Sequence, residues 1–136
     1  MLVKEGIHDI HRYPGHTPDI IRLIKDLNGK TADDPTLLWE DLTEADFRGY
    51  SSVNTTTTTG ETEDGWQQQT YQPAIFQFNP GSSGADTNEI VAWAITGSSG
   101  ELHYVETFDP AITMQEDALA IEIFLAVQYG DDVNGS

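Results

Sequence analysis

Hydrophobic and polar residues alternate along several stretches in the last two thirds of the chain. Residues 74–78 place an apolar side chain at every second position, which is the period of a strand with one buried face. Two further apolar runs, 90–96 and 101–108, are joined by a short turn with a glycine at each end, and this spacing predicts a hairpin. Short strands at such intervals are typical of a sandwich or barrel. The pattern therefore predicts an all-β domain.

Two segments carry signals for both a helix and a strand. Between Thr17 and Gly29 the chain has a helix-capping residue, a proline at the first helical position and a glycine where a helix would end, so the local signals favour a helix. Residues 113–116 have the spacing of a capping box. From Leu119 to Val127, however, apolar residues alternate without interruption. We predict a strand for this second segment, with Glu122 on its opposite face, whereas local pattern alone leaves the first segment open.

The first 18 residues form a separate region of the sequence. They have little periodic apolar character, and they contain three of the four histidines. We predict that residues 1–18 are an extended N-terminal arm that orders on a partner, and that residues 19–136 are one β domain. Residues 51–65 are rich in threonine and other small polar residues, which predicts a solvated hairpin or loop. A chain of 136 residues is long enough to bury a single core.

Charge divides the chain differently. All six lysines and arginines lie in the first 48 residues, whereas the remaining residues contain 13 of the 23 acids and no cation. A surface without cations cannot neutralise phosphates, so we expect no nucleic-acid partner. We expect the acidic body to face solvent and the basic third to make the electrostatic contact. The residues that we predict to dock on a partner are His8, His11, Arg12, Arg22 and Lys25.

Composition narrows the chemistry further. The chain has no cysteine, which rules out disulfides, thiolate metal sites and a cysteine nucleophile. No apolar run approaches the roughly 20 residues of a membrane span, and the first residues lack the apolar core of a secretory signal, so we expect no membrane partner. The sequence has no nucleophile elbow, no phosphate-binding glycine loop and no recognisable catalytic pair of acids. We therefore predict a non-enzymatic protein without a cofactor.

Some polar residues could bind a metal ion, but each also has a simpler interpretation. His8 and His11 would share a face of a helix and could then ligate a metal, but we interpret them as docking residues and predict no metal site. The acids Glu61, Glu63 and Asp64, and the pair Asp131-Asp132, could hold calcium, but neither group has the spacing of an EF-hand. We interpret both groups as solvated loop charge.

Aromatic residues and the remaining histidine are interpreted in the same way. Trp39, Trp66 and Trp93 could together form a platform that stacks on a sugar. Trp93 lies inside an apolar strand and is assigned to the core, so Trp66 is the possible exposed aromatic. His103 lies between two apolar positions of a strand, and we assign it a structural role rather than a catalytic one.

The segment from Trp39 to Tyr50, Trp-Glu-Asp-Leu-Thr-Glu-Ala-Asp-Phe-Arg-Gly-Tyr, supplies a resemblance. It resembles the most recurrent segment in a family of small virion proteins from tailed bacteriophages. The rest agrees in order, with an apolar strand upstream, a threonine-rich hairpin, an aromatic strand and the segment 106–113. The similarity extends over residues 19–127.

This resemblance implies a fold and a function. Residues 21–25 would be a strand, against the local helix signals, in an antiparallel, jelly-roll-like β-sandwich. The protein would be a capsid decoration or cement protein on the outer surface of the virion, present in multiple copies or as a homo-oligomer, with the major capsid protein as its partner. The alternative role is a tail- or fibre-associated module that binds a carbohydrate or a receptor.

Overall fold

The computed structural model describes residues 2–4, 19–54, 57–61, 67–71 and 73–129. In these ranges the protein is all-β, with ten strands in two sheets and one short 3-10 helix, η1 (Trp39–Asp41), and no α-helix. Every strand pair is antiparallel except β1 with β10, which is parallel. The predicted fold class is confirmed.

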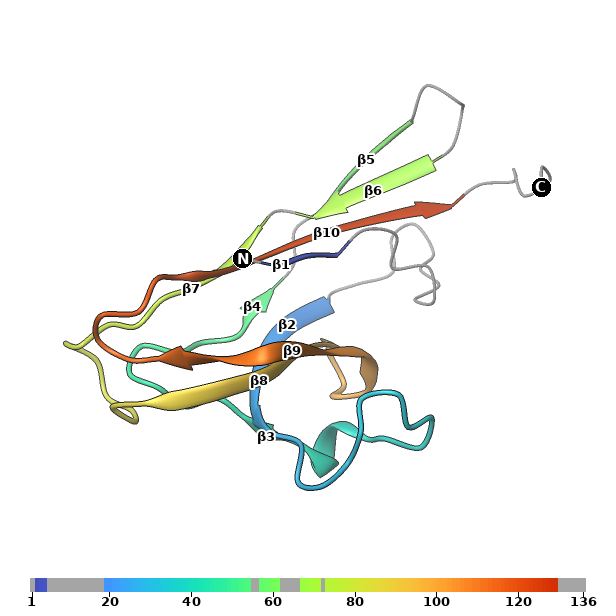
Figure 1. Ribbon diagram of the computed structural model, residues 1–136. Coiled ribbons are helices and arrows are strands. Elements are labelled where there is room, and N and C mark those ends of the chain that lie inside the picture. The colour runs from blue at the N-terminus through green and yellow to red at the C-terminus, as the bar shows by residue number, and fades with distance from the viewer. Residues whose placement is uncertain (1, 5–18, 55–56, 62–66, 72, 130–136) are drawn as a thin grey trace.

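The first sheet is built around the last strand. Its order is β1-β10-β6-β5, and β7 pairs with the beginning of β10 beside that path. Figure 1 shows β5, β6 and the end of β10 extending together beyond the rest of the described chain. The bounds are β1 (Leu2–Lys4), β5 (Thr57–Glu61), β6 (Gln67–Tyr71), β7 (Ala74–Phe76) and β10 (Ile121–Tyr129).

The second sheet has the order β3-β2-β8-β9, and β4 also pairs with β2. β8 and β9 form the hairpin that the glycine-bounded turn predicts, with a register shift near each end. The bounds are β2 (Asp19–Asp26), β3 (Thr43–Glu44), β4 (Val53–Asn54), β8 (Asn88–Gly97) and β9 (Leu102–Met114).

Both sheets contribute to one core. Leu23 and Trp93 from the second sheet are fully buried in the same hydrophobic cluster as Phe76 and Ile123 from the first. Alternate positions from Ala74 to Phe78 are buried, as the sequence pattern predicts. A core shared by two sheets is compatible with the predicted sandwich, while the jelly-roll arrangement stays a prediction.

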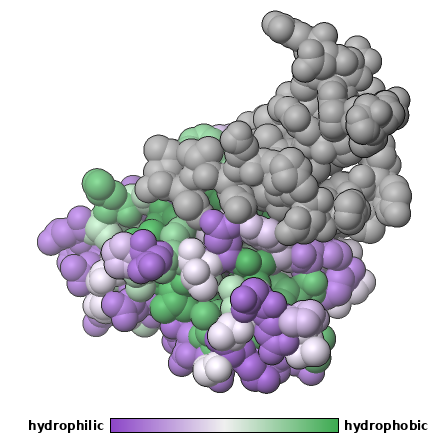
Figure 2. All heavy atoms as spheres, turned by 45° about the vertical axis from the view of Figure 1, so that its right-hand side comes forward, coloured by the Kyte–Doolittle hydropathy of each residue, from purple (hydrophilic) through white to green (hydrophobic). Residues whose placement is uncertain are grey.

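The second sheet is also buried on its other face. Ile24, Ala92 and Ala94 point away from the shared core and pack with Leu37 and Leu42 in a second cluster. The segment that covers this face runs from the end of β2 through η1 to β3, and it lies below the sheet in Figure 1. On the face shown in Figure 2, hydrophobic side chains of the described body are bordered by hydrophilic ones.

Burial on both faces explains why β2 is a strand despite its local helix signals. Ile21 and Leu23 enter the shared core, and Ile24 enters the second cluster. A strand with two buried faces has a nearly continuous apolar sequence, which resembles a buried helix turn in a short window. The helix interpretation of residues 17–29 is therefore wrong for its described part, and the strand implied by the resemblance is confirmed.

At the chain ends the structure refines the predicted boundaries. Leu2–Lys4, in the predicted arm, form β1 beside β10, whereas residues 5–18 lie outside the described residues. The last strand is confirmed, but it begins at Ile121, and Leu119 precedes it with 88% of its surface exposed. The helix signal at residues 113–116 is not realised, because these residues end β9 and begin a turn.

Candidate functional site

Arg22, a predicted docking residue, has its charged group bound within the chain. Its Nη1 donates to both carboxylate oxygens of Glu44 at 3.1 Å, and its Nε donates to Thr96 Oγ1 at 2.9 Å. The guanidinium also lies 5.1 Å from the centre of the Trp39 ring. The contact with Glu44 is bifurcated, because one guanidinium nitrogen is shared between the two carboxylate oxygens, and it is charge-assisted. Arg22 therefore joins β2, β3, β8 and η1.

Tyr50 completes this network at the edge of β2. β4 pairs with the beginning of this edge and β3 with its end, so the backbone of Leu23 lies between them. The Leu23 N–H donates to the Tyr50 hydroxyl at 3.1 Å, and the hydroxyl donates to Glu44. Burial, together with the hydrogen bond to Glu44, raises the pKa of Tyr50. The hydroxyl therefore stays protonated. It accepts the hydrogen bond from the Leu23 N–H that a backbone carbonyl of a neighbouring strand would otherwise accept.

Lys25, the next predicted docking residue, is also paired. Its Nζ lies 2.9 Å from Asp46 Oδ1. The buried Asn88 accepts from the Asp46 backbone N–H at 2.7 Å and donates to the Asp46 carboxylate at 3.0 Å. The hydrogen bonds from Lys25 and Asn88 lower the pKa of Asp46. Lys25 thus helps to hold the segment after β3 against β2 and β8.

The segment 45–50 is fixed further by a loop that follows β7. Arg48 pairs with Asp86 at 2.7 Å and donates to the Ser82 carbonyl at 2.8 Å. Gly49 has a φ of +84°, and a Cβ there would lie 2.7 Å from Cβ of Asn79. Only glycine combines this backbone conformation with so close an approach. Residues 44–50 of the segment that resembles the phage proteins are therefore held largely by internal contacts.

The other predicted docking residues, His8, His11 and Arg12, lie outside the described residues, as does Trp66. Sequence reasoning identified the basic character of Arg22 and Lys25 but could not find their partners, because these lie 21–74 residues away along the chain. Neither side chain is a free cation for docking in this structure.

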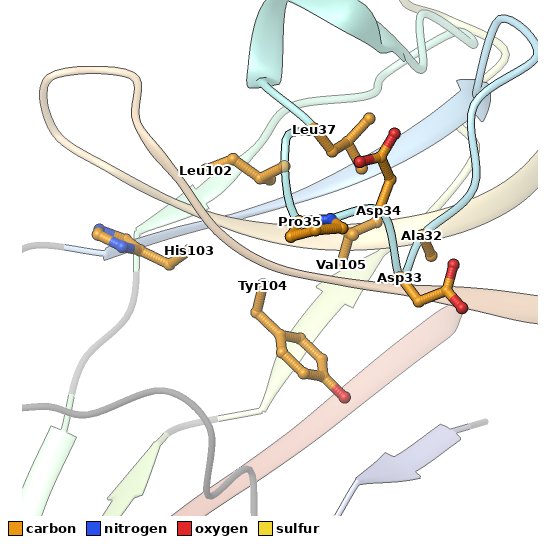
Figure 3. Close-up of a pocket in the computed structure, with 9 residues that line it drawn as sticks. All are labelled: Ala32, Asp33, Asp34, Pro35, Leu37, Leu102, His103, Tyr104 and Val105. Carbon is orange, nitrogen blue, oxygen red and sulfur yellow. The ribbon is translucent and has the colours of Figure 1, made fainter.

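A groove lies between residues 32–40 and 100–105 on the described surface. Its first pocket, with a volume of about 260 Å³, lies between the turn that precedes η1 and the beginning of β9. Figure 3 shows Leu37 and Leu102 between the loop and the strand, whereas the Tyr104 ring and the His103 ring point away from the loop. The apolar lining of this pocket comes from Ala32, Pro35, Leu37, Leu102 and Val105.

A second pocket adjoins the first. It shares Leu37 and Leu102 with it, has the same volume of about 260 Å³, and extends past Leu38 and Trp39 to the β8–β9 turn. Leu38 is one of the few large hydrophobic residues that are half exposed, at 53%. We use the word groove for both pockets together, with these apolar residues as its floor.

Acids surround this apolar floor. Asp33 and Asp34 line the first pocket, and Glu40 and Glu101 line the second. Hydrogen bonds from the backbone N–H and the hydroxyl of Thr36 lower the pKa of Asp34, so its carboxylate is ionised at neutral pH. Among the described residues that line either pocket there is no lysine or arginine. The groove therefore combines apolar contact with a negative rim.

Sequence reasoning missed the groove. In residues 33–35 the sequence carries no signal for the strand that faces them about 70 residues later along the chain. An aspartate pair before a proline is the composition of an ordinary turn. The exposed Leu38 beside Trp39 is the signal that could have indicated a surface contact.

The structure also bears on the alternative sites considered from the sequence, namely the sugar platform, His103 and the metal ligands. Trp93 is fully buried, as predicted, and Trp39 stacks under Arg22, so these two do not form a shared sugar platform. His103 Nε2 lies 3.8 Å from Glu101 Oε2. No group of metal-ligating residues occurs in the described part of the chain. Of the candidate calcium ligands, Glu63, Asp64, Asp131 and Asp132 lie outside it.

Comparison of the chain with models of protein families, with curated proteins and with solved structures finds no match. In the described residues, no helix has both the length and the hydrophobicity needed to cross a membrane.

Proposed function

We propose that this protein is a non-enzymatic structural protein of a bacteriophage particle that decorates or cements the outer surface of the capsid. Its partner is the major capsid protein, and it is present in many copies. The proposal rests on the resemblance of residues 39–50, and of the segments that follow in order, to small virion proteins of tailed phages.

The internal contacts made by residues 44–50 are the observation that supports this proposal. Glu44 and Tyr50 bind Arg22 and the edge of β2, Asp46 binds Lys25, and Arg48 binds Asp86. All these polar groups are used to hold strands and loops together. Such internal contacts keep the fold rigid. A structural protein needs this rigidity, because it must keep its shape on a particle.

We expect the groove, rather than Arg22 and Lys25, to contact the capsid shell. Because Arg22 and Lys25 are paired internally, they are poor candidates for contact with the shell. The groove is formed partly by the same N-terminal third, at residues 32–40, and partly by residues 100–105, and it offers an apolar floor with an acidic rim. In this arrangement the groove faces the shell, and the acidic remainder of the chain faces solvent.

Binding to the assembled shell alone stabilises that shell by mass action. The test is to titrate the purified chain onto particles of the encoding phage from which it has been stripped. We expect saturable binding with many sites per head and a rise in the temperature at which the heads open. Particles that neither bind the chain nor gain stability would contradict the proposal.

A further inference from the structure

The groove is made of two adjoining pockets, each with a volume of about 260 Å³. A cavity of about 150 Å³ holds a benzene-sized group, so each pocket has room for one long side chain. Two adjoining pockets with a shared wall suit two side chains from one segment.

The lining selects the chemistry of those side chains. Lysine and arginine have apolar stems that pack on hydrophobic surface while their charged ends remain near water. Leu37, Leu102 and Val105 provide such a surface, and Asp33 and Glu40 are exposed acids at the two ends of the groove. An anionic ligand would instead meet like charge, both from the rim and from a chain with a net charge of −17.

We infer that this groove binds a basic segment of a partner protein, with lysine or arginine stems on its apolar floor and their charged ends at the acidic rim. The inference relies on the proposed function only for the identity of that partner, the major capsid protein. The preference for cationic side chains is a property of the isolated chain.

An extended segment can present two side chains to the groove. Alternate side chains of such a segment point to the same face, so a probe with two cationic residues separated by one offers a side chain to each of the adjoining pockets. A suitable probe is the capped peptide Gly-Arg-Gly-Arg-Gly. The same peptide with glutamine in place of arginine is the neutral control, because it keeps the length of the peptide and a polar side chain at each position but not the charge.

The test is titration of the isotope-labelled full chain with each peptide, followed by nuclear magnetic resonance of the backbone amides. We expect saturable shifts for the arginine peptide, concentrated in residues 32–40 and 100–105, and weaker ones for the glutamine peptide. The double variant Asp33→Asn/Glu40→Gln removes two rim charges that make no hydrogen bond within the described chain. It should bind the arginine peptide about three- to tenfold more weakly, because exposed charge pairs each contribute little.

A matched variant separates the groove from general attraction to an acidic protein. Glu89→Gln/Glu116→Gln removes the same charge at the other end of the β8–β9 hairpin, where Glu89 pairs with Thr113. It should leave affinity for the arginine peptide nearly unchanged. Equal loss in both double variants, shifts scattered over the surface, or equal binding of both peptides would each overturn the inference.

Attachment to stripped particles tests the partner separately. If the unaltered chain attaches and Asp33→Asn/Glu40→Gln attaches equally well, the groove is not the docking surface, while the proposed function stands. If the unaltered chain does not attach, the proposed function fails, and the peptide titration still decides whether the groove prefers basic side chains.

Discussion

Replacing Arg22 with methionine tests whether the segment 39–50 is a structural clamp. The substitution keeps an unbranched apolar stem on β2 but removes the guanidinium. Glu44 then loses both of its hydrogen bonds from Arg22, and Thr96 and the Trp39 ring each lose a partner. Glu44 retains the hydrogen bond from Tyr50.

The size of the effect follows from burial. The side chains of Arg22 and Glu44 are 20% and 27% exposed, so the pair is neither fully buried nor on the surface. Removing one partner of a fully buried pair costs about 3–5 kcal/mol, and removing one partner of a surface pair costs about 0–1 kcal/mol. We expect Arg22→Met to lower the free energy of unfolding by about 2–3 kcal/mol, between these limits.

Arg48→Met is the matched control, because the same change removes a surface ion pair. Arg48 and Asp86 are 36% and 82% exposed, and Arg48 also donates one hydrogen bond to the Ser82 carbonyl, so the expected loss is about 1–2 kcal/mol. Urea unfolding of the two variants and of the unaltered chain, followed by circular dichroism, gives both values. If Arg22→Met is no less stable than Arg48→Met, the contacts of Arg22 with the segment 39–50 do not stabilise the fold as we expect.

Three further predictions follow from named contacts. Gly49→Ala should destabilise the protein by at least about 1 kcal/mol more than Gly29→Ala in the same unfolding assay, because both have positive φ but only Gly49 has a neighbour within 4 Å; equal losses would contradict the close approach. Asp46 has a lowered pKa, so its stabilising contribution is present above its unfolded pKa of about 3.8 and is lost as pH falls through the folded value. Urea midpoints measured from pH 5 to pH 3 should therefore decline less in Asp46→Asn than in the unaltered chain, and an identical decline would show that Lys25 and Asn88 do not stabilise the ionised carboxylate. Attachment to particles should weaken modestly as salt is raised, because screening acts over about 8 Å at physiological ionic strength; attachment that strengthens with salt would show that repulsion between acidic bodies limits occupancy.

Much of the fold could be predicted from the sequence, because strand periodicity and turn chemistry are local properties. The alternation at residues 74–78 and the hairpin joining residues 90–96 to 101–108 are both present. The segment 19–26 misled local reasoning, because a strand buried on both faces loses its alternation. Its assignment required the resemblance, which uses the order of elements along the chain.

The candidate site was much harder to predict. Arg22 and Lys25 are basic residues near a predicted arm, which indicates docking, but in the structure they pair with Glu44 and Asp46. The groove depends on the contact of residues 32–37 with residues 102–105, which the order of elements does not reveal. Local composition cannot distinguish a charge that is neutralised across the fold from one that is free.

Locating this chain in a reconstruction of the phage particle tests the central proposal most directly. We expect hundreds of copies on the outer surface of the head, with residues 32–40 and 100–105 against the major capsid protein. A few copies confined to the tail or its fibres would support the receptor-binding alternative and contradict capsid decoration.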